Sequence, residues 1–276
     1  MYHASERSGA FGGVPCLALP EILLLLLIMR FAFAFCKQHD ISVLQYRTRL
    51  DFSRDSSSGF LAIICWYLLA KDFANFWKGK NPLAITERLN ELDLIIAGNY
   101  TAKSAFDMAL YDIAAKHANQ PLYAFLGGNS KPIETDLTIG IDIPQSMAEH
   151  AIDFVKQGVN IIKVKLGKDP KEDIERIKSI RESIGYDTKI RIDANQGWAK
   201  EEALKVLEGL APYQIEFCEQ PMRKYYDDYL PALCAASPIA IMADESVFTH
   251  HDARRLIAEK ACHSINIKFS KSGGIH

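Results

Sequence analysis

NIIKVKL (160–166) is a short β-rich run, DPKEDIERIKSIRESIG (169–185) is an amphipathic helical stretch, and KIRIDAN (189–195) is a second β-rich run. This strand–helix–strand order recurs both before and after these segments. The β-rich runs that we expect to form strands are residues 135–143, 160–166, 189–195, 215–220, 239–246 and 264–270. Strands that alternate with helices predict a parallel sheet, because parallel neighbours need a crossover connection. A barrel and a doubly wound sheet both fit this alternation.

Ionisable residues distinguish these two architectures, because they fall at the ends of strands that should be buried. The residues in question are Lys163, Lys165, Asp193, Glu219, Asp244 and Lys268. Lys163 and Lys165 flank Val164, so both ammonium groups should project from one face of their strand. From Lys165 onward the charged residues follow one another at intervals of 24 to 28 residues, about one strand–helix unit of a (β/α)8 barrel.

This constant spacing predicts that the charges surround one mouth of the barrel, where active sites of this architecture lie. The fold class that we predict is therefore α/β: a TIM-type (β/α)8 barrel, incomplete with six βα strands, preceded by the remnant of an α+β capping domain. We expect three regions: an atypical N-terminal segment (1–80), the helical part of a capping domain (81–130) and a partial barrel (131–276).

The charged residues also predict a chemistry. Asp193, Glu219 and Asp244 would form an oxygen cage for Mg²⁺ or Mn²⁺, which prefer carboxylate oxygens to nitrogen or sulfur. Lys165 and Lys268 would lie across the mouth from each other, as two opposed bases. The metal would stabilise the negative charge that develops when a proton α to a carboxylate is removed. Lys163 and the metal would both favour the neutral amine of Lys165.

Each of these residues also has a plain structural interpretation. A KxK pair is commonly a solvated strand face, and DAN or DES is commonly a turn or a helix cap. The shared register of all the strand ends favours the functional interpretation, because solvated charges would not recur at inward positions of buried strands. For Asn195 a supporting hydrogen bond and a plain turn are equally favoured. We expect Lys271 to lie outside the site.

Composition excludes some partners. With 32 Lys and Arg against 34 Asp and Glu, the chain has a net charge of -2 and lacks the basic excess of a nucleic-acid-binding protein. A small-molecule substrate is the expected partner, and the sequence leaves a homo-oligomer open. The six cysteines are widely spaced without zinc-site patterns, so we interpret them as reduced thiols of a cytoplasmic protein.

The N-terminal region contains an apolar segment, residues 16–36. Glu21 and Arg30 interrupt it, and its uninterrupted apolar core is too short to span a bilayer. We therefore favour a buried helix, or an N-terminus that is not the natural one, over membrane attachment.

Further on, helical periodicity predicts helices within residues 82–98 and 101–120, the second with a stripe of small apolar residues.

The motifs IIKVKLG (161–167), RIDANQGW (191–198), EFCEQP (216–221), MADES (242–246) and INIKFSKSGG (265–274) occur in the order seen in the muconate-lactonising subgroup of the enolase superfamily, which the chain resembles. The resemblance extends to GNYTAKSAFDMALYDIAAKHANQPLYAFLGG (98–128), which is similar to the end of that family's capping domain. It implies Asp193, Glu219 and Asp244 as metal ligands, Lys165 and Lys268 as the acid/base pair, and Lys163 as an assisting lysine.

Within that subgroup the sequence looks most like the L-Ala-D/L-Glu dipeptide epimerases, which invert the α-carbon of the C-terminal residue. Muconate cycloisomerases, o-succinylbenzoate synthases and N-succinylamino acid racemases share the same positions and remain alternatives. The chain departs from the family pattern at both ends: it stops after the sixth strand, and residues 1–80 lack a counterpart of the family's first strands. It therefore looks truncated, and a non-catalytic truncated homologue is the alternative from another class.

Overall fold

The computed structural model describes residues 69–276. Residues 1–68 lie outside this range, and with them the apolar segment 16–36 and three of the six cysteines. The other three, Cys218, Cys234 and Cys262, are free thiols, as predicted for them. No helix within residues 69–276 is both long enough and apolar enough to cross a bilayer.

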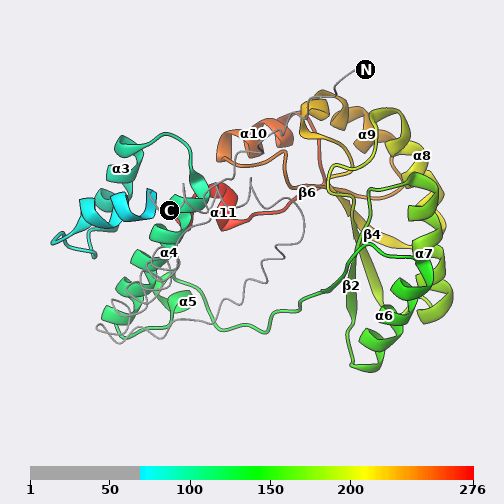
Figure 1. Ribbon diagram of the computed structural model, residues 1–276, viewed down its shortest axis with the longest axis horizontal. Helices are drawn as coiled ribbons and strands as arrows, with labels where there is room; N and C mark the ends of the chain where they lie inside the picture. Colours follow the sequence, from blue (N-terminus) through cyan, green and yellow to red (C-terminus); the bar gives the residue numbers. More distant parts are fainter. Residues whose placement is uncertain (1–68) are drawn as a thin grey trace, which may run out of the picture. The chain divides into compact units, whose positions relative to one another are not determined.

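Six parallel strands form one sheet whose spatial order follows the chain from β1 to β6 (Figure 1). Their bounds are β1 Leu137–Ile139, β2 Ile161–Lys165, β3 Lys189–Asp193, β4 Ile215–Glu219, β5 Ile241–Ala243 and β6 Ser264–Ile265. A doubly wound sheet would reverse its strand order at a switch point, whereas a barrel adds each strand beside the previous one. The sequential order confirms the predicted barrel architecture, with six strands in the described residues.

Helices connect the strands, and α6 to α9 lie along one side of the sheet (Figure 1). The helices of this part are α6 Pro144–Lys156, α7 Pro170–Ile184, α8 Lys200–Leu210, the 3-10 turns η1 Ala211–Tyr213 and η2 Lys224–Tyr229, α9 Leu230–Ala236, α10 His250–Ala258 and α11 Phe269–Ser272. Two of them begin at strong caps. Asp169 accepts the backbone N–H groups of Lys171 and Glu172 before α7, and Thr249 forms a capping box with Asp252 before α10.

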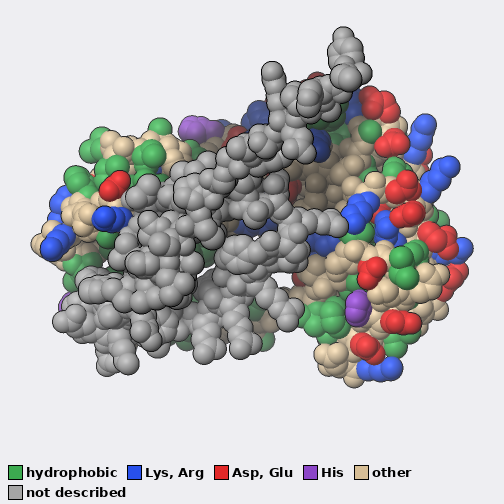
Figure 2. Space-filling view, in the orientation of Figure 1, with side chains coloured by type: hydrophobic (Ala, Val, Ile, Leu, Met, Phe, Trp, Pro, Cys, Tyr) green, Lys and Arg blue, Asp and Glu red, His purple; other side chains and the backbone are tan. Residues whose placement is uncertain are grey.

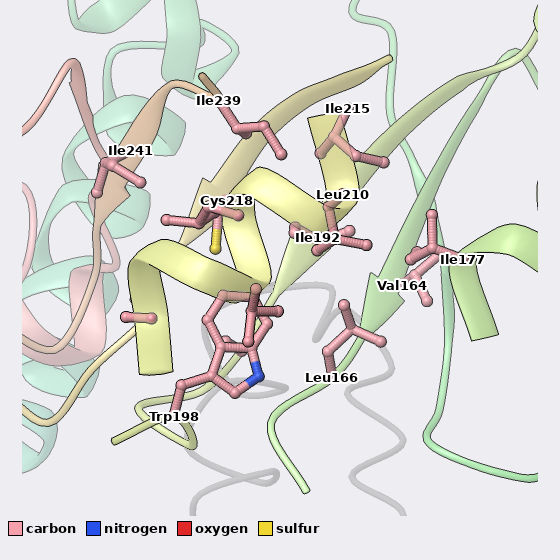
Figure 3. Packing of buried hydrophobic residues seen from close by; sticks show 14 of the residues in the cluster. Val164, Leu166, Ile177, Ile192, Trp198, Leu210, Ile215, Cys218, Ile239 and Ile241 are labelled. Carbon is pink, nitrogen blue, oxygen red and sulfur yellow. The ribbon is translucent and has the colours of Figure 1, made fainter. Parts of the chain in front are cut away.

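The two faces of each strand differ in chemistry. On β2, Ile162 and Val164 are fully buried against the helices, whereas Lys163 and Lys165 alternate with them and point to the other face. Figure 3 shows this apolar layer, in which Val164, Ile192 and Cys218 of the strands pack with Ile177 of α7 and Leu210 of α8. The hydrophobic core thus lies between sheet and helices, and the charged residues occupy the opposite face.

The sixth strand is shorter than the sequence predicts. It ends at Ile265, so Lys268 is not at a strand end but is the residue that precedes α11. The backbone N–H of Asn266 still bonds to the carbonyl of Ala243 at 2.8 Å, after which the chain turns. Ile267, which follows the strand, and Phe269, the first residue of α11, are 75% and 49% exposed.

The residues before the barrel form a second cluster. Residues 69–77 are helical and pack with α3 (Ile85–Ile95) and α4 (Tyr100–His117) around Phe73 and Leu92, and the short α5 (Leu122–Phe125) follows. Both predicted helices are present. The stripe of small apolar residues predicted for α4 is only partly buried, however, because two of its members, Ala105 and Ala109, are exposed. The polar residues Lys103, Ser104 and Asp107 are buried instead.

Charged side chains of both signs are mixed on the outer faces of the helices. Figure 2 shows acidic and basic groups intermixed on the visible face of the β/α part. Several are helical pairs, such as Lys178 with Glu175 and Arg255 with Glu259. This mixture agrees with the nearly balanced composition.

Arg181 of α7 joins the amino ends of two strands. The residue is 3% exposed, and its guanidinium donates to the carbonyls of Thr188 (2.7 Å) and Gly185 (3.0 Å) before β3, and of Tyr213 (2.7 Å) and Gln214 (3.0 Å) before β4. Burial of the guanidinium lowers the pKa of Arg181 below its ordinary value. One side chain thereby donates to four backbone carbonyls in the segments that precede two neighbouring strands.

We predict that Arg181→Met lowers the free energy of unfolding by about 3 kcal/mol or more, because it removes four hydrogen bonds at once and leaves the buried carbonyl of Thr188 without its donor. The measurement is urea denaturation followed by circular dichroism. Arg254→Met is the matched control, since Arg254 lies on the exposed side of α10. Equal shifts of the urea midpoint in the two variants would show that the Arg181 contacts add nothing to stability.

Candidate active site

Lys163 and Lys165 of β2 both reach the carboxylate that ends β3. Lys165 Nζ donates to Asp193 Oδ2 at 2.6 Å, and Lys163 Nζ lies 2.9 Å from the same oxygen. Lys163 also donates to Glu219 Oε2 at the end of β4. The two lysines therefore share a strand face, as predicted, and Lys163 bridges two neighbouring carboxylates.

Residues of the segment that follows β6 continue this pattern. Lys268 Nζ donates to Asp244 Oδ2 and lies 3.9 Å from Glu219 Oε1. Asn266 Nδ2 donates to that Glu219 oxygen at 2.7 Å. Cations and anions thus alternate along the carboxyl edge of the sheet. We call the six predicted residues Lys163, Lys165, Asp193, Glu219, Asp244 and Lys268 the charged row.

The backbone register explains why these side chains meet. Lys165 is paired with Asp193 across β2 and β3, and Asp193 with Glu219 across β3 and β4. Neighbouring strands lie about 4.8 Å apart, so residues in register present their side chains at hydrogen-bonding range. Asp244 directly follows the last residue of β5 and stands at the same edge.

The carboxylates are buried and the lysines are less so. Asp193 and Asp244 are 0% exposed and Glu219 is 2% exposed. Burial opposes ionisation of Lys163, but its hydrogen bonds to Glu219 and Asp193 outweigh this effect and raise its pKa. Burial likewise acts to raise the pKa of Asp244, yet the hydrogen bonds from Lys268 and Lys271 bring it below its ordinary value. Mutual pairing therefore keeps both groups charged.

Asn195 combines both roles considered for it. It has a left-handed φ of 45°, so it forms part of the turn after β3, and its backbone N–H donates to Asp193 Oδ1 at 2.9 Å. Its side-chain oxygen accepts a hydrogen bond from Lys165 Nζ at 2.7 Å. The turn conformation is what brings the amide to the lysine.

Two glycines bring the loops after β2 and β3 together. A Cβ on Gly167 would overlap the carbonyl of Ala194, and one on Gly197 would overlap the backbone of Gly167. Buried Asp173 of α7 ties the same loops, because it accepts the backbone N–H of Gly167 at 2.8 Å and the indole N–H of Trp198 at 2.9 Å. The turns that carry Lys165 and Asn195 are therefore fixed against each other.

Lys271 corrects an expectation from the sequence. It was expected outside the site, but its ammonium group donates to Asp244 Oδ1 and, at 2.5 Å, to the Asp244 carbonyl. The physical reason is the short helix α11, which turns Lys271 back over the sheet edge three residues after Lys268. The sequence motif KFSK holds both lysines, but only the turn shows that they face one carboxylate.

Gln220 and Glu245 are polar neighbours that the sequence analysis did not single out. Gln220 is 1% exposed, and its side-chain oxygen accepts the backbone N–H of Asp244 at 2.8 Å. Within residues 69–276 the buried Oε2 of Glu245 has no hydrogen-bond partner. Burial, and after it the negative charge of Asp244, raises the pKa of Glu245. Each of them directly follows a predicted metal ligand in the sequence, and this position is the signal that could have identified them.

The donor chemistry of the row suits a hard divalent cation, since Asp193, Glu219 and Asp244 offer only carboxylate oxygens. Their spacing is that of a lysine-paired cluster: within residues 69–276, no three His, Cys, Asp or Glu side chains gather closely enough to hold a metal ion. In this arrangement a lysine ammonium group contacts each of the three carboxylates. The residue types fit the ion.

Comparisons with known proteins agree with the architecture. The D-Ala-D/L-Ala epimerase of Cytophaga hutchinsonii is 50% identical over 198 residues, covering 71% of this chain and 54% of the relative. The L-Ala-D/L-Glu epimerase of Clostridium acetobutylicum is 45% identical over 193 residues, covering 68% and 53%. The crystal structure of the Cytophaga hutchinsonii dipeptide epimerase with Mg and D-Ala-L-Val superposes with a TM-score of 0.74 at 46% identity, covering 76% of this chain and 57% of that one.

The chain thus spans about half the length of the curated relatives it matches. Two family models match it in the expected order. Residues 66–127 match the mandelate racemase / muconate lactonizing enzyme N-terminal domain, and residues 146–276 match the enolase C-terminal domain-like family. With both domains represented in sequence and the corresponding fold in the barrel part, the chain belongs to the mandelate racemase/muconate lactonizing enzyme family of the enolase superfamily.

Proposed function

We propose that this protein is an Mg²⁺-dependent epimerase that moves the proton α to a carboxylate, with dipeptides as the substrate class. The observation that carries the proposal is the alternation of lysines and buried carboxylates in the charged row. Structural ion pairs at a surface would not require three carboxylates at 0 to 2% exposure on consecutive strands. Their concentration at the carboxyl edge favours a catalytic role.

Lys165 and Lys268 are the proposed bases. They are the most exposed ammonium groups of the row, with side-chain exposures of 29% and 43%, compared with 16% for Lys163. They also come from opposite ends of the row, since Lys165 contacts Asp193 and Lys268 contacts Asp244. A substrate held between them would meet one amine on each face, which is what inversion of a stereocentre requires.

Lys163 and Asn195 have supporting roles in this proposal. Lys163 is held by two carboxylates and would place a fixed positive charge beside Lys165. Asn195 would orient the Lys165 amine through its 2.7 Å contact. Asp193, Glu219 and Asp244 would hold the metal, which when bound supplies electrostatic stabilisation of the negative charge developing on the substrate carboxylate.

The dipeptide class rests on the similarity to epimerases of D-Ala-D/L-Ala and L-Ala-D/L-Glu, which differ from each other in substrate side chain. The second candidate is racemisation of an N-succinylamino acid, favoured by a 34% identical N-succinyl-L-Arg/Lys racemase of Bacillus cereus. Both substrates present an acylated α-amino acid, so the same two lysines would serve either. The competing proposal from another class is a non-catalytic homologue.

We predict that the chain exchanges the α-proton of the C-terminal residue of L-Ala-L-Glu with solvent in D₂O containing Mg²⁺. Proton NMR would follow the loss of that signal, and N-succinyl-L-Arg would test the second candidate in parallel. Chelation with EDTA should abolish exchange, and added Mg²⁺ should restore it. Absence of Mg²⁺-dependent exchange with both compounds would favour the non-catalytic homologue.

Variants of the two bases should act on one face each. In Lys268→Ala, we expect exchange to continue for one epimer and to fall by about 100-fold or more for the other, with the pattern reversed in Lys165→Ala. The reason is that each lysine removes the proton from one face only. Deuterium incorporation is measured separately for L-Ala-L-Glu and L-Ala-D-Glu. Lys178→Ala, on the outer face of α7, is the control, and equal losses for both epimers would contradict the two-base assignment.

Binding of the ion can be tested without turnover. We predict that Mg²⁺ raises the midpoint of thermal unfolding, because a ligand that binds only the folded chain stabilises it, by about 2.7 kcal/mol at 100 times its Kd. Asp193→Asn should remove this increment, whereas Asp228→Asn, at a residue outside the row, should retain it. A midpoint that does not respond to Mg²⁺ would argue against a metal site.

A further inference from the structure

We propose that Lys271 is a positioning residue that fixes the carboxylate of Asp244, so that its other oxygen stays directed to Lys268 and would be available to a metal ion. This inference rests on the proposed function, because it assigns a role around the same site. Lys271 does not contact the other members of the charged row: within residues 69–276 its hydrogen bonds go to the Asp244 side chain and to two backbone carbonyls.

The ammonium group of Lys271 uses all of its donors. It bonds to Asp244 Oδ1, to the Asp244 carbonyl at 2.5 Å and to the Asn266 carbonyl at 3.0 Å. A lysine ammonium has three N–H donors and no acceptor, so no donor remains for a substrate. Lys271 therefore connects the end of β5 to the segment that follows β6.

The two oxygens of Asp244 are divided between two lysines. Oδ1 accepts from Lys271, and Oδ2 accepts from Lys268. Because Lys271 holds Oδ1 together with the Asp244 main chain, rotation of the carboxylate is restricted, and Oδ2 is the oxygen directed to the row. The Lys271 side chain is 11% exposed, compared with 43% for Lys268, so it is placed as a support and Lys268 as the accessible base.

The helix that carries Lys271 is itself held by α4. Buried Asp107 accepts the backbone N–H groups of Ile275 at 2.5 Å and His276 at 3.1 Å. Gly274 passes so close to Asp107 that a Cβ there would overlap its carboxylate. Thr101 donates to the Ser270 carbonyl of α11 at 2.8 Å. These contacts fix the backbone of α11 and, with it, the position of the Lys271 ammonium group.

Replacement of Lys271 distinguishes two possible roles, because they predict changes of Mg²⁺ affinity in opposite directions. Lys271 is a cation beside a proposed Mg²⁺ ligand, so if it acted through charge alone, its replacement by a neutral residue would tighten Mg²⁺ binding by removing repulsion. If it positions Asp244, the same replacement frees the carboxylate and weakens binding. Loss of a group that orients a metal ligand typically lowers metal affinity by about 10- to 100-fold.

The experiment measures Mg²⁺ affinity by calorimetry for the unvaried 276-residue chain and for Lys271→Met, Lys271→Arg and the control Lys178→Met. Methionine keeps the length and apolar stem of lysine, and arginine keeps the charge but not the compact three-donor group. We expect Mg²⁺ binding to weaken about 10-fold or more in Lys271→Met, to be partly retained in Lys271→Arg and to be unchanged in Lys178→Met. Thermal unfolding of each variant confirms that it is folded.

A second readout is α-proton exchange of the two L-Ala-Glu epimers in D₂O. Because Asp244 also holds Lys268, Lys271→Met should slow the exchange that depends on Lys268 more than the exchange that depends on Lys165. Unchanged or tighter Mg²⁺ binding in folded Lys271→Met would overturn the positioning role while leaving the proposed function intact. Failure of the unvaried chain to bind Mg²⁺ would overturn both.

Discussion

The burial of three carboxylates at one edge of the sheet is the constraint on which the rest of the site depends. Asp193, Glu219 and Asp244 are almost inaccessible to water, and an isolated buried carboxylate is strongly disfavoured. Each must therefore be paired, and lysines from β2 and from the chain after β6 supply the pairing. Because the buried carboxylates need cationic partners for the chain to fold, lysines gather beside them, and these are the groups that could move a proton.

The periodicity of the sequence was sufficient to predict the architecture. The apolar positions of the strands and the regular recurrence of charged residues predicted parallel strands, their sequential barrel-type arrangement and the face on which Lys163 and Lys165 lie. These predictions succeeded because alternation along a strand is strictly local: Ile162 and Val164 need the helices, so their neighbours must point the other way. The ranges proposed for the three regions of the chain remain predictions.

Features that depend on non-local contacts were not predictable from the pattern. β6 was expected to reach Lys268, but it ends at Ile265, because strand length depends on partners that a linear sequence does not show. The position of Lys271 was predicted wrongly for a similar reason, since a single turn of helix decides whether this lysine faces solvent or Asp244. Asp107 was not singled out in the sequence, because its partners, the backbone N–H groups of Ile275 and His276, lie 168 and 169 residues further along the chain.

The contact between Gly167 and Gly197 has a consequence for engineering this scaffold. Each glycine lies two residues beyond a side chain of the site, Lys165 and Asn195 respectively, and the two backbones touch where a methyl group could not fit. A side chain introduced at either position would push the two loops apart and would so displace Lys165 and the Asn195 amide that orients it. Libraries intended to change substrate preference should therefore hold both glycines constant, although neither carries a functional group.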